Sequence, residues 1–511
     1  MAAQKPAFKP YLQDQLMAFP PTFDELIPQE HPVRVIDSVV AKINLLPLLK
    51  AYSIRGASNY HPAMLLKVLL YGYMTNVYSS RKIAEACRER VPFIWLSAMA
   101  RPDHNTINRF RSVRLKETLR KVFEEVVNLL CDEGLLSIEE VYTDGTKIEA
   151  NANKYTFVWK KAIQTNKEKM RRQIDEIWKH AQSVADQDEI DPEPPTNHTV
   201  SSERVNAAVQ KLNEVLGEKK NIDKKVRAKL GYINKNFPMN IAKYEAQEAV
   251  MGERNSCSKT DPDATFMRMK EDHMKNGQLK PGYNVQISTS NQFIVNFTIH
   301  SNPTDTLTLG PHIEQHEQSF GKAPKKLTAD AGYGSQENYT LLEKKEVEAF
   351  VKYSLFDKEQ DKNYNSKHSF GANKLFYNAH QDIYICPMGQ KMEYIGNTIR
   401  KTSSGFEQVL RKYQAGNCSN CPLNGSCHKS RGNRIIEVNM ELNRLKAKAY
   451  SLLNSEEGKM RRKIRCHDVE TVFGNIKQNH GFRRFMLRGK EKVAIEWGLL
   501  AIAHNIRKKV A

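Results

Sequence analysis

The chain lacks any long uncharged apolar run, and it contains few cysteines. Its most apolar stretches, such as residues 63–73, are short and are interrupted by charged residues such as Lys67, so no membrane span is expected. The first residues contain no apolar signal core, and we therefore expect a cytoplasmic protein that is not exported. Eight cysteines in 511 residues indicate reduced thiols or metal ligands rather than a disulfide scaffold.

Acidic residues are also scarce relative to basic ones. The chain has 78 Lys and Arg against 58 Asp and Glu, which gives a formal net charge of +20. Nucleic acid is the leading candidate for a partner, because many Lys and Arg side chains can neutralise its phosphates and so favour binding. A merely soluble basic protein is the alternative that charge alone leaves open. The length allows about two to four domains.

The N-terminal part is predicted to be helical. Residues 1–30 are expected to form an extended arm, and residues 31–135 show apolar residues at helical spacing. Residues 104–114 form the second helix of a pair that resembles a helix-turn-helix, with Ile107, Phe110 and Val113 on one side. The side chains offered to DNA bases and phosphates are those of His104, Asn105, Asn108, Arg109 and Arg111. An ordinary basic surface helix is the alternative.

Two short strands are each followed by an aspartate and a glycine. The β-prone run 140–143 leads to Asp144 and Gly145, and residues 324–329 lead to Asp330, with glycines after it. A carboxylate at the end of a buried strand is held rigidly, although Asp-Gly alone is more typical of a hairpin turn. With further strands near residues 283–300, the pattern predicts an α/β fold around a mixed sheet in residues 136–354.

Two inserts interrupt this α/β pattern. Residues 155–250 contain long charged helices with sustained apolar spacing, which predicts an antiparallel helical hairpin. Residues 355–440 are polar and loop-rich, and they hold a cysteine group. Thiolates at this spacing suit a structural, tetrahedral zinc site, with unliganded thiols as the alternative. The four candidate ligands are Cys386, Cys418, Cys421 and Cys427.

The C-terminal part, residues 441–511, is the most basic. It places Glu470 on a probable helix with Lys477 two turns further along the same face. A dense basic group follows at Arg483, Arg484 and Arg488. Three carboxylates in one α/β unit, Asp144, Asp330 and Glu470, are the hard oxygen ligands that phosphodiester chemistry with two divalent cations needs. Mg²⁺ fits such ligands, and Mn²⁺ usually substitutes.

Several blocks together make the chain similar to a known family. These blocks are Tyr142-Thr-Asp-Gly-Thr-Lys147, Ala329-Asp-Ala-Gly-Tyr-Gly334, Val469-Glu-Thr-Val-Phe-Gly-Asn-Ile-Lys477 and Gly481-Phe-Arg-Arg-Phe485. The chain resembles a bacterial insertion-sequence transposase of the DDE type, whose catalytic core has a ribonuclease H-like fold. The resemblance also takes in the N-terminal helical region and the cysteine-bearing insert.

The resemblance assigns roles to particular residues. It makes Asp144, Asp330 and Glu470 the catalytic triad that binds Mg²⁺, and Lys477 a contact to DNA. Relatives with the Tyr–Arg–Glu–Lys signature place a tyrosine and an arginine before the glutamate. Here Arg465 can serve as the arginine, but Arg462 stands at the tyrosine position.

The resemblance also implies a reaction and partners. The reaction is hydrolysis at transposon ends, followed by attack of the freed 3′-hydroxyl on target DNA. The partners are the terminal inverted repeats, the target DNA and a second copy of the chain in a paired-end complex at the nucleoid. Arg483, Arg484 and Arg488 would contact phosphates, as could Lys147. The alternatives are a ribonuclease H-like nuclease or resolvase without strand transfer, and an inactive transposase that acts as a DNA-binding repressor.

Overall fold

The computed structural model describes residues 20–50, 52, 59–184, 190–197, 199–217, 222–269, 278–367 and 369–510. The chain divides into two compact units. One unit consists of Met1–Val122 together with Ile502–Ala511, and the other is Phe123–Ala501. Most of the expected N-terminal arm, residues 1–19, lies outside the described residues.

The first unit is built from helices in its described part. They are α1 (Pro32–Lys42), α2 (Leu46–Leu49), α3 (Pro62–Met74), α4 (Ser80–Glu89), α5 (Val91–Leu96) and α6 (His104–Arg109), followed by a π-helical turn η1 (Phe110–Arg114). Both α1 and α3 begin at a proline, where a missing N–H costs nothing, and the preceding histidine accepts a backbone N–H. The helical prediction for this stretch is confirmed.

The π-helical turn changes which side chains face inward at the end of α6. Ile107 and Phe110 are buried but Val113 is 56% exposed, so the three side chains do not share one side as predicted. A π-turn closes each hydrogen bond one residue later than an α-turn, which rotates the following side chains away from the face that α-helical spacing predicts. The sequence gives no simple sign of such a turn.

A mixed sheet forms the centre of the second unit. Its strands are β1 (Glu140–Glu149), β4 (Thr265–Arg268), β5 (Leu279–Ser290), β6 (Phe293–His300), β7 (Lys326–Ala329) and β8 (Glu348–Val351). Five of the strands follow the order β4-β5-β1-β7-β8. The sixth strand, β6, also pairs with β5. β1 pairs antiparallel with β5 and parallel with β7, and β7 pairs parallel with β8. The predicted α/β fold with a mixed sheet is confirmed.

Helices follow the strands of this sheet. α7 (Leu119–Asp132) precedes β1, α11 (Leu309–Phe320) connects β6 to β7, and α12 (Gln336–Lys344) connects β7 to β8. Near the C-terminus come α14 (Met440–Asn454), α15 (Glu456–Gly474), the π-helical turn η6 (Asn475–Asn479) and α16 (Lys490–Val510). Helix α15 packs on β1, β5 and β7, which brings a segment from the end of the chain onto the centre of the sheet.

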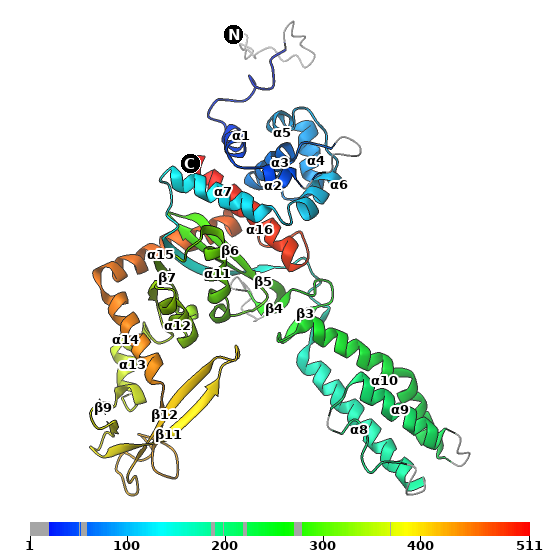
Figure 1. The fold of residues 1–511 in the computed structure, drawn as a ribbon, viewed down its shortest axis with the longest axis vertical. Coiled ribbons are helices and arrows are strands. Elements are labelled where there is room, and N and C mark those ends of the chain that lie inside the picture. Colours follow the sequence, from blue (N-terminus) through cyan, green and yellow to red (C-terminus); the bar gives the residue numbers. More distant parts are fainter. Residues whose placement is uncertain are drawn as a thin grey trace, which may run out of the picture. The chain divides into compact units, whose positions relative to one another are not determined.

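The first insert is a bundle of three helices rather than the predicted hairpin of two. Strands β2 (Phe157–Trp159) and β3 (Ser256–Ser258) pair at its base, and between them lie α8 (Lys160–Val184), α9 (Ser202–Leu216) and α10 (Lys224–Met251). The three helices lie side by side (Figure 1) and share one apolar core. Helix α10 was missed as a separate element because its apolar stripe is weak and Pro238 interrupts its pattern.

The second insert, expected to be loop-rich, contains an antiparallel sheet. Its strands are β9 (Phe376–Asn378), β10 (Ile383–Ile385), β11 (Lys391–Lys401), β12 (Glu407–Ala415) and β13 (Ile435–Val438), paired in the order β13-β12-β11-β10-β9. A small core of Tyr384, Met392, Tyr413, Ile436 and Val438 supports the sheet.

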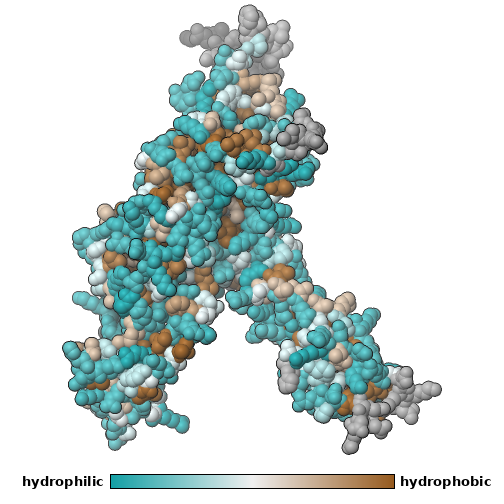
Figure 2. All heavy atoms as spheres, viewed as in Figure 1, coloured by the Kyte–Doolittle hydropathy of each residue, from teal (hydrophilic) through white to brown (hydrophobic). Residues whose placement is uncertain are grey.

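The outer surface is mostly polar. Figure 2 shows hydrophilic residues over most of the visible face, with hydrophobic residues in small patches. Among the described residues, no helix is both long enough and apolar enough to cross a membrane.

Candidate active site

Asp144 and Asp330 lie next to each other at the point where two parallel strands separate. The pairing of β1 with β7 ends at Thr143 and Ala329, and each aspartate is the residue that follows. Asp144 is only 5% exposed, since β1 continues past it to Glu149 in antiparallel pairing with β5. β1 therefore does not turn at Asp-Gly, as a hairpin would. Both aspartates lie where the β1–β7 pairing ends.

Helix α15 brings Glu470 to Asp144 through an arginine. Arg465 Nη2 donates to Glu470 Oε1 over 3.0 Å, and Arg465 Nη1 lies 3.7 Å from Asp144 Oδ2. The Arg465 side chain is 15% exposed, so this guanidinium lies largely out of water between the two carboxylates. The structure therefore links Glu470 to Asp144 through Arg465, and it places Asp330 directly after the strand that pairs with β1.

Several buried polar side chains lie close to these carboxylates. Asn284 and Gln286 are buried on the same face of β5, and Tyr333 donates its hydroxyl to Gln286 Oε1. Burial raises the pKa of Tyr333 well above its usual range, and the charges of Asp305, Asp144 and Asp330 raise it further. Tyr333 is therefore a neutral hydrogen-bond donor that fixes Gln286.

Asp305 is a fourth acidic residue at this place, and sequence reasoning missed it. It begins the short 3-10 helix η2 (Asp305–Leu307), after β6. Its Oδ1 accepts hydrogen bonds from Asn284 Nδ2 at 2.7 Å and from Gln286 Nε2 at 2.9 Å. The available signal was weak, since a lone aspartate a few residues after a strand is also common in ordinary loops.

Gly145 allows the close approach that these contacts need. A Cβ atom at Gly145 would lie 2.7 Å from Asp305 Oδ1 and would also overlap the Gln286 amide. Gly145 thus makes room for neighbouring polar side chains of the same chain.

The basic segment after α15 pairs with the end of β1. Glu149 N donates to the carbonyl of Arg483, and Phe485 N donates to the carbonyl of Glu149. Arg484 donates to the carbonyls of Ala150 and Ala152, and Arg488 donates to the carbonyl of Asn151. These exposed arginines thus bind the backbone at the end of β1 and keep further N–H groups at the surface.

The remaining candidate DNA contacts near the site differ in exposure. Lys477 lies in η6 and is only 7% exposed. Lys147 is half-buried on β1, two residues beyond Gly145. Of the predicted DNA-contacting residues in this part of the chain, the arginines at 483, 484 and 488 are the exposed ones.

In the helical unit, the predicted recognition residues separate into two groups. Asn105, Asn108 and Arg109 are exposed on α6, and His104 is half-buried at its start. Arg111 is buried instead: its Nη1 donates to the carbonyl of Tyr78 over 2.8 Å and to the Tyr73 hydroxyl over 3.2 Å. The π-turn directs this side chain inward, so Arg111 holds the helix in place and presents no surface for a base edge.

The four candidate zinc ligands line one small cavity in the second insert, together with His428. Cys386 Sγ accepts Gln390 N–H and Cys418 Sγ accepts Arg434 N–H, each at 3.3 Å, and Arg434 Nη1 lies 2.8 Å from Cys427 Sγ. Across the residues described, however, no three His, Cys, Asp or Glu side chains are gathered closely enough to form a metal site. The acidic side chains around Arg465 do not form such a group either.

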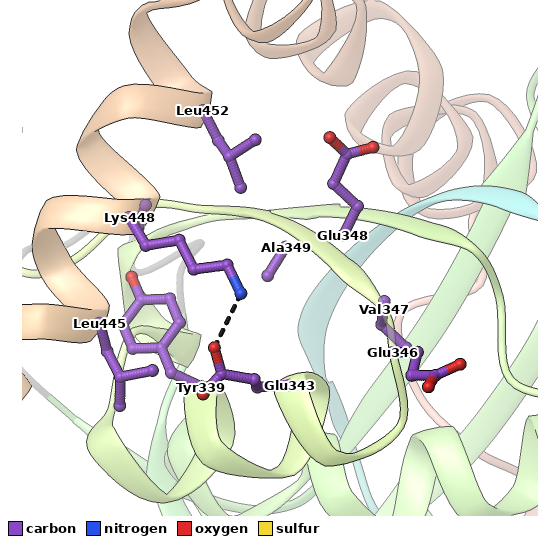
Figure 3. A pocket seen from close by; sticks show the side chains of 10 residues that line it. Tyr339, Glu343, Glu346, Val347, Glu348, Ala349, Leu445, Lys448 and Leu452 are labelled. Atoms are coloured by element: carbon purple, nitrogen blue, oxygen red, sulfur yellow. Dashed lines mark hydrogen bonds and ion pairs between the residues drawn. The ribbon is translucent and has the colours of Figure 1, made fainter. Parts of the chain in front are cut away.

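A separate cavity of about 400 Å³ lies between α12, β8 and α14 (Figure 3). Lys448 and Arg444 reach across to Glu343 there, and their hydrogen bonds lower the pKa of Glu343 to about 2. The three carboxylates of the candidate active site do not line this cavity.

Two stretches of the chain match known protein families. Residues 21–113 match the family described as a transposase domain (DUF772), and residues 385–510 match the family described as a transposase DDE domain. The second match includes Arg465 and Glu470. No curated protein and no solved structure matched significantly. Both stretches are thus similar to transposase domains, which is consistent with a DDE transposase of an insertion sequence.

Proposed function

We propose that this protein binds the terminal inverted repeats of an insertion sequence and catalyses metal-dependent DNA strand cleavage and strand transfer. The observation that carries this proposal is the contact of Arg465 with both Asp144 and Glu470, beside Asp330 at the end of the neighbouring strand. Carboxylates from three distant segments thus lie at strand ends of one mixed sheet or on the helix packed against it, which supports the ribonuclease H-like core implied by the sequence resemblance.

The side chains at this site are of the chemical kind that divalent cations bind. Carboxylate oxygens of Asp144, Asp330 and Glu470 are the ligands that Mg²⁺ and Mn²⁺ prefer. When bound, such ions activate an attacking water or 3′-hydroxyl and stabilise the leaving oxygen. The rigid strand ends keep the two aspartates in fixed register, and Arg465 partly neutralises the acidic group before any cation arrives.

DNA binding rests on two exposed basic surfaces, one in each unit. Asn105, Asn108 and Arg109 on α6, with His104 at its start, form a surface suited to reading an end sequence. Arg483, Arg484 and Arg488 form a second surface, next to the loop after β1, where they would hold phosphates of the bound DNA. A second copy of the chain would then pair two transposon ends.

A structural zinc ion in the second insert is a further part of this proposal. The cavity between Cys386, Cys418, Cys421 and Cys427 supports it, and so does the nearly buried Arg434, whose charge would be balanced by thiolates. Metal analysis of the purified protein should find close to one zinc per chain. Cys421→Ser should release this zinc, and a metal-free wild-type protein would refute the zinc site.

The main test is an end-cleavage assay with a labelled DNA duplex that carries the element's terminal repeat. Asp144→Asn, Asp330→Asn and Glu470→Gln should each abolish Mg²⁺-dependent cleavage while leaving DNA binding by gel shift intact. The matched control is Glu456→Gln, because Glu456 lies on the same helix as Glu470 but is 92% exposed at the surface.

The same assay separates the alternatives. Joined products between the end and a target plasmid indicate a transposase, whereas cleavage without joining indicates a nuclease or resolvase. A wild-type protein that binds the ends but never cleaves them would identify a repressor. Full cleavage by any of the three carboxylate variants would overturn the proposed active site.

A further inference from the structure

The structure places Asp305 next to the first two carboxylates of the proposed site. A Cβ atom built on Gly332 would lie 3.0 Å from Asp330 Oδ1 and 3.4 Å from Asp305 Oδ2. These two carboxylate oxygens therefore lie close to each other. On the other side, Asp305 Oδ1 borders Gly145, directly after Asp144. Asp305 therefore lies between the segments that carry Asp144 and Asp330.

The Asp305 carboxylate is held in a fixed orientation by amide donors. Its Oδ1 accepts both Asn284 Nδ2 and Gln286 Nε2, and Gln286 is itself fixed by Tyr333. The short helix η2 is also tied to the backbone after Asp330, because Thr306 Oγ1 donates to the carbonyl of Gly332 over 3.1 Å. Such anchoring leaves little reorganisation for binding a ligand.

The second oxygen of Asp305 remains available. Within the described residues, Asp305 Oδ2 accepts no hydrogen bond, and neither Asp305 nor Asp330 forms an ion pair with a lysine or arginine. Arg465 contacts Asp144 and Glu470 rather than these two carboxylates. Two neighbouring carboxylates without a cationic partner favour binding of a divalent cation.

We propose that Asp305 is a fourth carboxylate of the metal site, with Oδ2 binding a divalent cation or its water shell on the Asp330 side. This inference rests on the proposed function, because it assumes that Asp144 and Asp330 hold divalent cations. In this proposal, the side-chain amides of Asn284 and Gln286 hold Asp305 Oδ1, and they thereby orient Oδ2 toward the metal.

The test is Mn²⁺ binding to the full chain without DNA, measured by electron paramagnetic resonance. Asp305→Asn should weaken binding about tenfold or more, or remove one bound ion. Asn284→Ala keeps the carboxylate but removes one anchor, and it should weaken binding several-fold; it also serves if Asp305→Asn fails to fold. Asp357→Asn is the control, since Asp357 is an exposed aspartate paired with Lys352.

The outcomes distinguish this inference from the proposed function. If the wild-type protein binds Mn²⁺ and Asp144→Asn weakens that binding, but folded Asp305→Asn and Asn284→Ala bind as the wild type does, the role of Asp305 is refuted alone. If the wild-type protein binds no Mn²⁺ even at millimolar concentration, the metal-dependent function itself fails. Weakened binding in Asp305→Asn with an unchanged Asp357→Asn supports the fourth carboxylate.

Discussion

Arg465 Nη2 donates to Glu470 Oε1 over 3.0 Å, and the other end of the same guanidinium faces Asp144. A cation of the protein thus occupies the space between two proposed metal ligands. Removing it would leave the acidic group more negative, because interactions between charges a few ångströms apart are strong where little water penetrates.

Arg465→Ala should therefore bind Mn²⁺ more tightly than the wild type in the absence of DNA. We expect a several-fold lower dissociation constant, since about 1.4 kcal/mol of added electrostatic attraction corresponds to a tenfold change. Isothermal titration calorimetry measures this directly. Lys463→Ala, at an exposed position of the same helix, should leave the affinity unchanged. Unchanged or weaker binding in Arg465→Ala would contradict the idea that this arginine competes with metal.

Gly145→Ala should disrupt the site although it adds only one methyl group. The new Cβ would overlap the Gln286 amide and approach Asp305 Oδ1, both of which belong to the buried polar layer. We expect a loss of about 1–3 kcal/mol in the free energy of unfolding, measured by urea titration, together with lost end cleavage. In Gly231→Ala a methyl group enters open space within α10, so stability should stay equal or rise by up to about 1 kcal/mol. Equal effects of the two substitutions would argue against tight packing around Gly145.

His316 should make stability depend on pH in the acidic range. Burial lowers the pKa of His316 from 6.5 to about 4, so the folded protein keeps this ring neutral while the unfolded chain protonates it below pH 6.5. Stability from this residue is fully present above pH 6.5 and falls by up to about 1.4 kcal/mol per pH unit down to about pH 4. Urea midpoints measured from pH 7.5 to 4.5 should show a smaller drop in His316→Phe than in the wild type. His467→Phe, at an exposed position, should retain the full drop.

Leu212→Ala should weaken the three-helix bundle without affecting the central sheet. Leu212 is fully buried in the core shared by α8, α9 and α10, and the cavity left behind should cost about 2–4 kcal/mol. Hydrogen exchange followed by mass spectrometry should speed up in α8–α10 while protection in β1 and β5 stays the same. Faster exchange in β1 as well would show that the bundle and the sheet unfold as one cooperative unit.

The sequence was informative where local patterns determine structure. Strand-like runs before Asp144 and Asp330 and apolar spacing around Glu470 predicted the elements that carry the three carboxylates, and these elements form as expected. The family resemblance linked residues that no local pattern connects. Their meeting point depends on the register of β1 with β7, which sequence periodicity does not provide.

Other features depended on tertiary context. Asp305 joins the site because two amides on β5 reach it, and amides on a strand look the same whether they face water or a buried carboxylate. Arg111 turns inward because of a π-turn, although its basic surroundings favoured an exposed position. The sheet of the second insert escaped prediction because its strands, including the long pair β11 and β12, are rich in polar residues and resemble loops until they pair.

The backbone pairing of Glu149 with Arg483 and Phe485 has a consequence for biosynthesis. A ribosome releases Asp144 and its strand long before it makes the segment that closes that strand's end. Until α15 and the residues up to Phe485 have emerged, the nascent chain has neither Glu470 nor the carbonyl of Arg483 to which Glu149 donates. The N-terminal unit is thus complete in sequence early in translation, apart from its last helical residues, whereas the proposed active site is complete only near the end.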